Sequence, residues 1–161
     1  MHRGTSGTQS GVTLVEVLVT MVILAIGLLG LVGLQARLQV LQSEAYQRAQ
    51  ALMLLKDMAG RITNNRNNAA AYVTGADDPI GVDACPTDTS TRRNADVAEW
   101  CNLVQGAGEE TTAGTRVGAM VGGRGCVEDL GNGQYLVTVA WQGLAPISAP
   151  PESVACGLGD F

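Results

Sequence analysis

The chain has 161 residues, with 10 basic and 15 acidic side chains and a net charge of −5 at pH 7. Such an acidic chain lacks the clustered Lys and Arg that meet nucleic-acid phosphates, so nucleic acid is not expected as its main partner. The only histidine is His2, which stands close to the N-terminus. We therefore predict no Ser-His-Asp or Cys-His arrangement, no enzyme activity and no cofactor.

A long apolar segment follows the first residues of the chain. Gly11-Val12-Thr13-Leu14-Val15-Glu16 leads into eighteen uncharged residues, Val17 to Leu34. A helix of this length crosses a hydrocarbon core of roughly 30 Å. The carboxylate of Glu16 lies inside this apolar segment, where a charge is costly and marks a functional position.

The helical pattern continues beyond the apolar segment. We predict one helix from Thr13 to about Ile62, which at 1.5 Å per residue is roughly 75 Å long. Its second half is amphipathic, because apolar residues recur at spacings of three and four. The predicted apolar face consists of Leu38, Leu41, Ala45, Ala49, Leu52, Leu55, Met58 and Ile62.

Helix signals end in the asparagine-rich stretch 64–68, after which residues 69–73 can add one more turn. A loop region follows from Thr74 to Ala98, and Asp96 to Val104 is a candidate short helix that carries Trp100. Residues 116–121 are a weak strand candidate. Because aromatic residues dominate interface hot spots, Trp100 is either an interface anchor or a core residue.

Asn132-Gly133 predicts a two-residue type I′ hairpin. The flanking strands then pair with residue numbers that sum to 265, so that Leu130 faces Tyr135 and Cys126 faces Val139. Alternate residues of the second strand share one face and can pack on the amphipathic half of the helix. A long helix packed on a small antiparallel sheet predicts an α+β fold. The residues of the shared face are Tyr135, Val137, Val139 and Trp141.

The four cysteines all lie after the long helix. An even number in a small exported domain indicates two disulfides in an oxidising compartment. Three pairings are possible, and we favour Cys85–Cys101 with Cys126–Cys156, because the first closes a short polar loop and the second ties the tail across the hairpin. The cysteines form no Cys-x-x-Cys pair and lack an accompanying histidine, so no zinc site is expected.

The segment Gly11 to Glu16 resembles the class III signal of type IV prepilins. This resemblance implies that prepilin peptidase cuts between Gly11 and Val12 and methylates the amine of Val12, although phenylalanine or methionine is more usual than valine there. It also implies that Glu16 meets the N-terminal amine of a neighbouring subunit during assembly. From Gly11 to Gln35, and more weakly from Val137 to Gly143, the chain resembles the PilV-like minor pilins.

The resemblance divides the chain into a leader (residues 1–11), a membrane or filament-core half-helix (12–34), an amphipathic half-helix (35–62) and a periplasmic head (63–161). It implies a minor pilin that is inserted in the inner membrane and then joins a surface pilus, at or near the tip. The implied partners are other minor pilins, the major pilin, prepilin peptidase and a tip adhesin. The alternatives are a type II secretion pseudopilin and a pilin that binds DNA or an adhesive ligand.

Several features of the sequence have two possible interpretations. The N-terminal segment is alternatively an uncleaved anchor or an ordinary secretory signal, and Glu16 can instead extend to the headgroups. Gly27, Gly30 and Gly33 either allow close helix packing or mark a segment that unwinds in a filament. Scattered loop acids suggest solvated carboxylates rather than a calcium loop, and four arginines are candidates for a basic patch. The acids are Asp77, Asp78, Asp83 and Asp88, and the arginines are Arg92, Arg93, Arg116 and Arg124.

Overall fold

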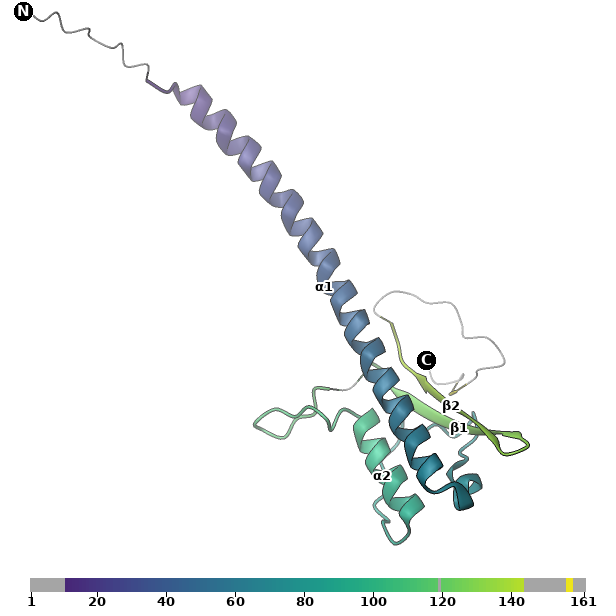
Figure 1. The fold of residues 1–161 in the computed structure, drawn as a ribbon. Helices are drawn as coiled ribbons and strands as arrows, with labels where there is room; N and C mark the ends of the chain where they lie inside the picture. The colour runs from purple at the N-terminus through teal and green to yellow at the C-terminus, as the bar shows by residue number, and fades with distance from the viewer. Residues whose placement is uncertain (1–10, 119, 144–155, 158–161) are drawn as a thin grey trace, which may run out of the picture. The chain divides into compact units, whose positions relative to one another are not determined.

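The computed structural model describes residues 11–118, 120–143 and 156–157. The chain forms two compact units, Met1–Gln42 and Ser43–Phe161, which are described separately. Helix α1 (Leu14–Asn64) contributes residues to both units (Figure 1). The predicted long helix is therefore confirmed, with its ends displaced by one and two residues.

Every described residue of the first unit is exposed, including the whole apolar run of α1. An 18-residue window of this helix has a mean hydropathy of 2.8, so the helix is long and apolar enough to cross a membrane. Apolar side chains that nothing covers are unfavourable in water. The first half of α1 therefore presents a surface that suits lipid or other apolar helices.

In the second unit, the buried face of α1 differs from the predicted one. The buried residues are Gln47, Ala51, Leu54, Met58 and Ile62, so only the last two belong to the predicted face. Leu52 and Ala49 of the predicted face are exposed. Between residues 45 and 55 the helix is apolar on two sides, and periodicity alone does not show which side the head covers.

Two short helices follow α1. A 3₁₀ segment, η1 (Arg66–Tyr72), has a kink at Asn68, so the predicted extra turn is present but is not a regular α-helix. Helix α2 (Arg92–Val104) begins four residues before the predicted start. The reason is the N-cap: the Thr91 hydroxyl accepts a hydrogen bond of 3.2 Å from the Asn94 amide, which satisfies an otherwise unpaired first-turn donor.

Strands β1 (Arg124–Gly131) and β2 (Gln134–Ala140) form an antiparallel hairpin. Asn132 and Gly133 both have positive φ, at 55° and 74°, as a type I′ turn requires. The predicted register is wrong by one residue, because Cys126 pairs with Thr138 and Asp129 pairs with Tyr135. Only the pair next to the turn, Gly131 with Gln134, has the predicted register, in which the residue numbers of the partners sum to 265.

The register error has a local cause at Leu130. This residue is an extra residue on β1, between the Asp129 and Gly131 pairs, which is a β-bulge. Gly131 has a φ of 80°, and its amide donates a 2.8 Å hydrogen bond to the Asp129 carboxylate. The side chain of Asp129 thus holds the glycine in the conformation that displaces Leu130 from the ladder.

The weak strand prediction for residues 116–121 is wrong for the residues that the structure describes there. Arg116 forms only an isolated bridge with Glu110, and the Val117 amide donates to the Glu109 carbonyl at 2.8 Å. These contacts make a closed loop rather than a third strand. Ile80, from the loop before α2, forms the other isolated bridge, with Gly125 of β1.

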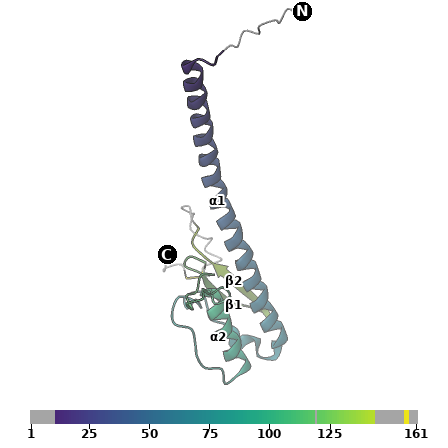
Figure 2. The same cartoon turned by 90° about the vertical axis from the view of Figure 1, so that its left-hand side faces the viewer.

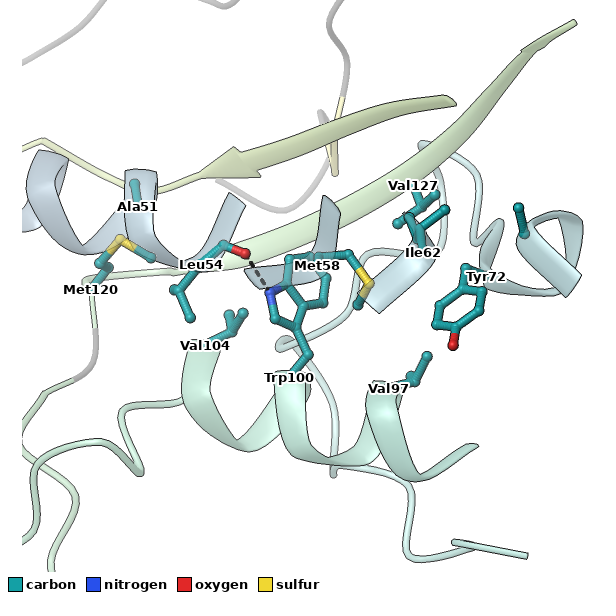
Figure 3. Packing of buried hydrophobic residues seen from close by; sticks show 11 residues of the cluster. Ala51, Leu54, Met58, Ile62, Tyr72, Val97, Trp100, Val104, Met120 and Val127 are labelled. Atoms are coloured by element: carbon teal, nitrogen blue, oxygen red, sulfur yellow. Dashed lines mark hydrogen bonds between the residues drawn. The ribbon is translucent and has the colours of Figure 1, made fainter. Parts of the chain in front are cut away.

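The core of the second unit lies between α1, α2 and the hairpin. Figures 1 and 2 both show α2 beside the C-terminal part of α1, and Figure 3 shows their interdigitated side chains. The predicted face of β2 packs against this core. The fold is α+β, with a long helix, a small antiparallel sheet and disulfide-linked loops. The largest fully buried side chains are Trp100, Tyr72, Met58, Val104, Val127 and Cys126.

Candidate functional site

The first turn of α1 holds Glu16 in a defined position. Thr13 precedes the helix, and the Glu16 amide donates to the Thr13 carbonyl at 3.0 Å and to its hydroxyl at 3.4 Å. Thr13 is therefore the N-cap, and Glu16 is the third helical residue. The spacing Thr-x-x-Glu is that of a capping box, a local signal in the sequence that was not among the predictions.

This position has an electrostatic consequence. The first turn of a helix carries unpaired amides and the positive end of the helix dipole, both of which favour a carboxylate. Glu16 is the acidic residue of that turn. The helix end thus supports the negative charge of Glu16 while leaving the exposed side chain free to meet a cation from another molecule.

Gly11 and Val12 lie immediately before the helix, in backbone that has no regular structure. Val12 is 71% exposed, and a Cβ atom added at Gly11 would meet no other atom within 4 Å. Nothing within the described chain therefore requires glycine at position 11. Residues 1–10 of the predicted leader lie outside the described part of the chain.

Gly27, Gly30 and Gly33 lie within a continuous helix. A Cβ atom added at any of them would also meet no other atom within 4 Å. Each glycine weakens the helix by up to about 1 kcal/mol relative to alanine. As at Gly11, no contact within the described chain accounts for these glycines. Close packing and unwinding in a filament both involve neighbouring helices.

Two disulfides brace the second unit. They join Cys85 to Cys101 and Cys126 to Cys156, which is the pairing that the sequence favours. The first ties the loop before α2 to the helix itself. The second ties a residue beyond the hairpin to β1. Cys126 and Val127 are both fully buried on opposite faces of β1, so the strand is covered on both sides at this point.

A polar network joins α1, η1 and α2. Asp96 is only 4% exposed and accepts hydrogen bonds from Tyr72 at 2.6 Å, from Arg61 at 3.2 Å and from Arg92 at 3.2 Å. Burial, together with the hydrogen bond to Asp96, raises the pKa of Tyr72. The buried carboxylate thus has a partner on each neighbouring element, as buried charges require.

The same network extends to the surface. Arg61 also donates to Glu99 at 2.9 Å and to Asp57 at 2.7 Å. The hydrogen bond from Arg61 and its positive charge lower the pKa of Glu99. Because Glu99 is 65% exposed, water screens this pair and its effect on stability is small. These contacts hold α1, η1 and α2 together.

The four arginines of the suggested basic patch do not come together. Arg92 pairs with Asp96 at the start of α2, whereas Arg116 donates to Asn102 and Gln105 near its end. Arg124 is 3% exposed and donates to the Gly157 carbonyl at 2.7 Å. Among the described residues, no group of three or more His, Cys, Asp or Glu side chains could hold a metal ion.

Trp100 is not an exposed interface anchor. Its side chain is fully buried, and its indole N–H donates to the Leu54 carbonyl at 2.9 Å, as Figure 3 shows. Gly125 of β1 packs against the ring, since a Cβ atom there would lie 2.6 Å from Cζ3. The core interpretation of Trp100 is therefore correct.

Comparison with known proteins identifies the N-terminal segment. A family model of the prokaryotic N-terminal methylation motif matches residues 7–32, a stretch that includes Gly11, Val12 and Glu16. No curated protein and no solved structure matches the chain. The motif implies processing by prepilin peptidase, assembly with other pilins and anchoring in a membrane. The chain thus carries a prepilin-type signal that supports a type IV pilin-like or pseudopilin-like function.

Proposed function

We propose that the protein is a PilV-like minor pilin that joins other minor pilins to prime a type IV pilus and remains at its tip. The observation that carries this proposal is the methylation motif over residues 7–32, which coincides with an exposed segment before α1 and with Glu16 in its first turn. The role is one of structure and interaction.

In this proposal, residues 1–11 are the leader and prepilin peptidase cuts after Gly11. The new amine of Val12 is methylated. Residues 12–34 span the inner membrane and later enter the filament core, residues 35–62 are the amphipathic half of α1, and residues 63–161 are the periplasmic head. Two disulfides in the head support an oxidising compartment.

Glu16 is the proposed assembly residue. An unpaired carboxylate in hydrocarbon is unfavourable, and the N-terminal amine of a neighbouring subunit is a suitable cation. All apolar side chains of the span are exposed, which leaves the helix available for packing against other helices. The proposed partners are other minor pilins, the major pilin and a tip adhesin.

Two variants separate processing from assembly. Gly11→Leu places a bulky side chain at the proposed cleavage site, and we expect a membrane-bound precursor that is longer than the mature protein by the leader. Glu16→Val is expected to be processed normally and to be absent from pili. Glu16→Asp, which keeps the charge, is the matched control. Normal piliation by processed Glu16→Val protein would contradict the assembly role.

Deleting the gene tests which apparatus uses the protein. Loss of surface pili and twitching is expected for a priming minor pilin. Loss of protein secretion with pili intact would instead identify a pseudopilin. Normal piliation with lost DNA uptake or lost attachment would identify a ligand-binding pilin.

A further inference from the structure

The hairpin has two outer edges, and among the described residues pairing is seen at one of them. On β1, Gly125 exchanges backbone hydrogen bonds of 2.8 and 2.9 Å with Ile80, and the Val127 carbonyl accepts from the amides of Thr74 and Gly75. The segment before α2 therefore covers the outer edge of β1. No residue in the described parts of the chain pairs with the outer edge of β2.

The ladder shows which β2 groups point outward. Because Gly125 and Val127 direct their backbone groups away from β2, their partners Val139 and Val137 likewise direct theirs away from β1. Tyr135 follows the same alternation. These three residues present three amides and three carbonyls along the outer edge of β2. Leu136 and Thr138 point inward and bond to β1.

We propose that the outer edge of β2 accepts an extended segment of another protein as a third strand of this sheet. The inference rests on the proposed function, because the other protein is a member of the same pilus assembly. A regular row of backbone donors and acceptors is complemented by another extended strand, through main-chain hydrogen bonds. An edge strand of this kind is a template for such pairing.

The sequence of β2 lacks the features that protect edge strands from pairing. Folded proteins protect an open edge with lysine, proline, a bulge or a very short strand. The seven residues of β2 include no charged residue and no proline, and the bulge lies on β1 instead. Three of the seven, at positions 137, 138 and 139, are β-branched, as suits pairing.

Symmetry argues that the third strand comes from a different chain. Two copies of β2 that pair antiparallel are related by a two-fold axis perpendicular to the sheet. Since α1 packs on one face of the sheet, this axis would also reverse the direction of α1. Two stems inserted in the same membrane from the same side must run in the same direction. Antiparallel self-pairing is therefore incompatible with insertion of both stems in one membrane.

The chemistry of the accepted segment follows from its surroundings. Its residues opposite Tyr135, Val137 and Val139 would extend the apolar face that packs against the core, so alternate residues should be apolar. The chain carries a net charge of −5, and Glu128 and Asp129 lie on the adjacent strand. Charge complementarity thus favours a neutral or basic segment over an acidic one.

Amide hydrogen exchange at single residues tests the proposal. In the full-length mature protein purified alone in detergent, the amides of Tyr135, Val137 and Val139 should exchange rapidly, while those of Leu136 and Thr138 are protected. In the complex of this protein with its co-purified pilins, the first three should slow by at least tenfold. Unchanged exchange in the complex would overturn the proposal, and so would protection of the three amides in the protein alone, because the edge would then be covered without a partner.

A proline at position 137 provides a second, independent test. Val137→Pro removes an outward amide and leaves the inward ladder intact, a position where edge strands tolerate proline. Val137→Thr changes the same side chain but keeps the amide. Protection of the Leu136 and Thr138 amides in both variants shows that the hairpin is folded. The proline variant should then co-purify with at least tenfold less partner protein than the threonine variant. Equal recovery by a folded proline variant would overturn the proposal.

These experiments separate the present inference from the proposed function. Suppose that the protein forms a complex with other pilins and that Glu16→Val abolishes this complex. If the three outward amides still exchange rapidly in the complex, only the third-strand proposal is contradicted. A protein that forms no complex with other pilins under any condition would contradict the minor pilin role and the third strand together. Hydrogen exchange of the wild-type complex distinguishes these two outcomes even if Val137→Pro does not fold.

Discussion

The indole N–H of Trp100 on α2 donates to the main-chain carbonyl of Leu54 on α1, at 2.9 Å. This hydrogen bond joins two helices whose residues are 46 positions apart in the chain. The ring itself fills the centre of the head and touches the hairpin at Gly125. One side chain thus connects α1, α2 and β1, and two predictions concern it directly.

Trp100→Ala should destabilise the head by about 3–5 kcal/mol, the usual cost of removing a large aromatic side chain from a core. Trp100→Phe keeps much of the buried area but loses the N–H donor, so its effect should be smaller. Urea unfolding of the detergent-solubilised protein measures both changes. If Trp100→Ala has wild-type stability but no longer binds its partners, the core interpretation is wrong and Trp100 is an interface residue.

Gly125→Ala should be destabilising by about 1–3 kcal/mol, because the added methyl overlaps the Trp100 ring. A smaller ring should relieve this overlap. We therefore expect Gly125→Ala to cost less in a Trp100→Phe background than in the wild type, so that the two changes are not additive. Strict additivity in a double-mutant cycle would show that the two residues do not touch.

Tyr72→Phe should cost about 1–2 kcal/mol at neutral pH, because the Asp96 carboxylate loses a buried donor. Burial raises the pKa of Tyr72, so its contribution is complete below the unfolded pKa of about 10 and declines as pH rises through the folded pKa. The stability difference between wild type and variant should therefore narrow above pH 10. A difference that stays constant from pH 8 to pH 11 would contradict the shifted pKa.

The two disulfides should differ in their resistance to reduction. Cys126 and Cys156 are at most 2% exposed, whereas Cys85 is partly exposed on a loop, so a mild thiol should open Cys85–Cys101 first. Loss of either crosslink is expected to cost about 3–4 kcal/mol on the chain-entropy estimate. Alkylation followed by peptide mapping gives the order. Earlier reduction of Cys126–Cys156 would show that its shielding is incomplete.

Much of this fold could be predicted because its signals are local. The long helix follows from an apolar run and then a three-four spacing, and the type I′ turn follows from two residues that both adopt positive φ. The face of β2 that packs on the core follows from strand alternation. Each of these depends on neighbours in the sequence and on no distant contact.

The incorrect predictions all depend on distant or competing contacts. Residues 45–55 of α1 are apolar on two sides, and only the packing of α2 and the hairpin selects the side with Ala51 and Leu54. The stretch around Arg116 could be strand or loop until Glu110 pairs with it. In the candidate site, Thr13 was available from the sequence as a capping residue, because Thr-x-x-Glu is a local signal.

The bulge at Leu130 has a consequence for how this hairpin tolerates insertions and deletions. Since Leu130 is the unpaired residue, a chain that lacks it would still pair Asp129 with Tyr135 and would keep the two-residue turn. Removing any residue from 124 to 128 would instead turn part of β1 over and expose the side chains that it buries. Deletions in this hairpin should therefore be tolerated at Leu130 and disruptive at residues 124–128, and related chains aligned by sequence alone should place their gaps at Leu130.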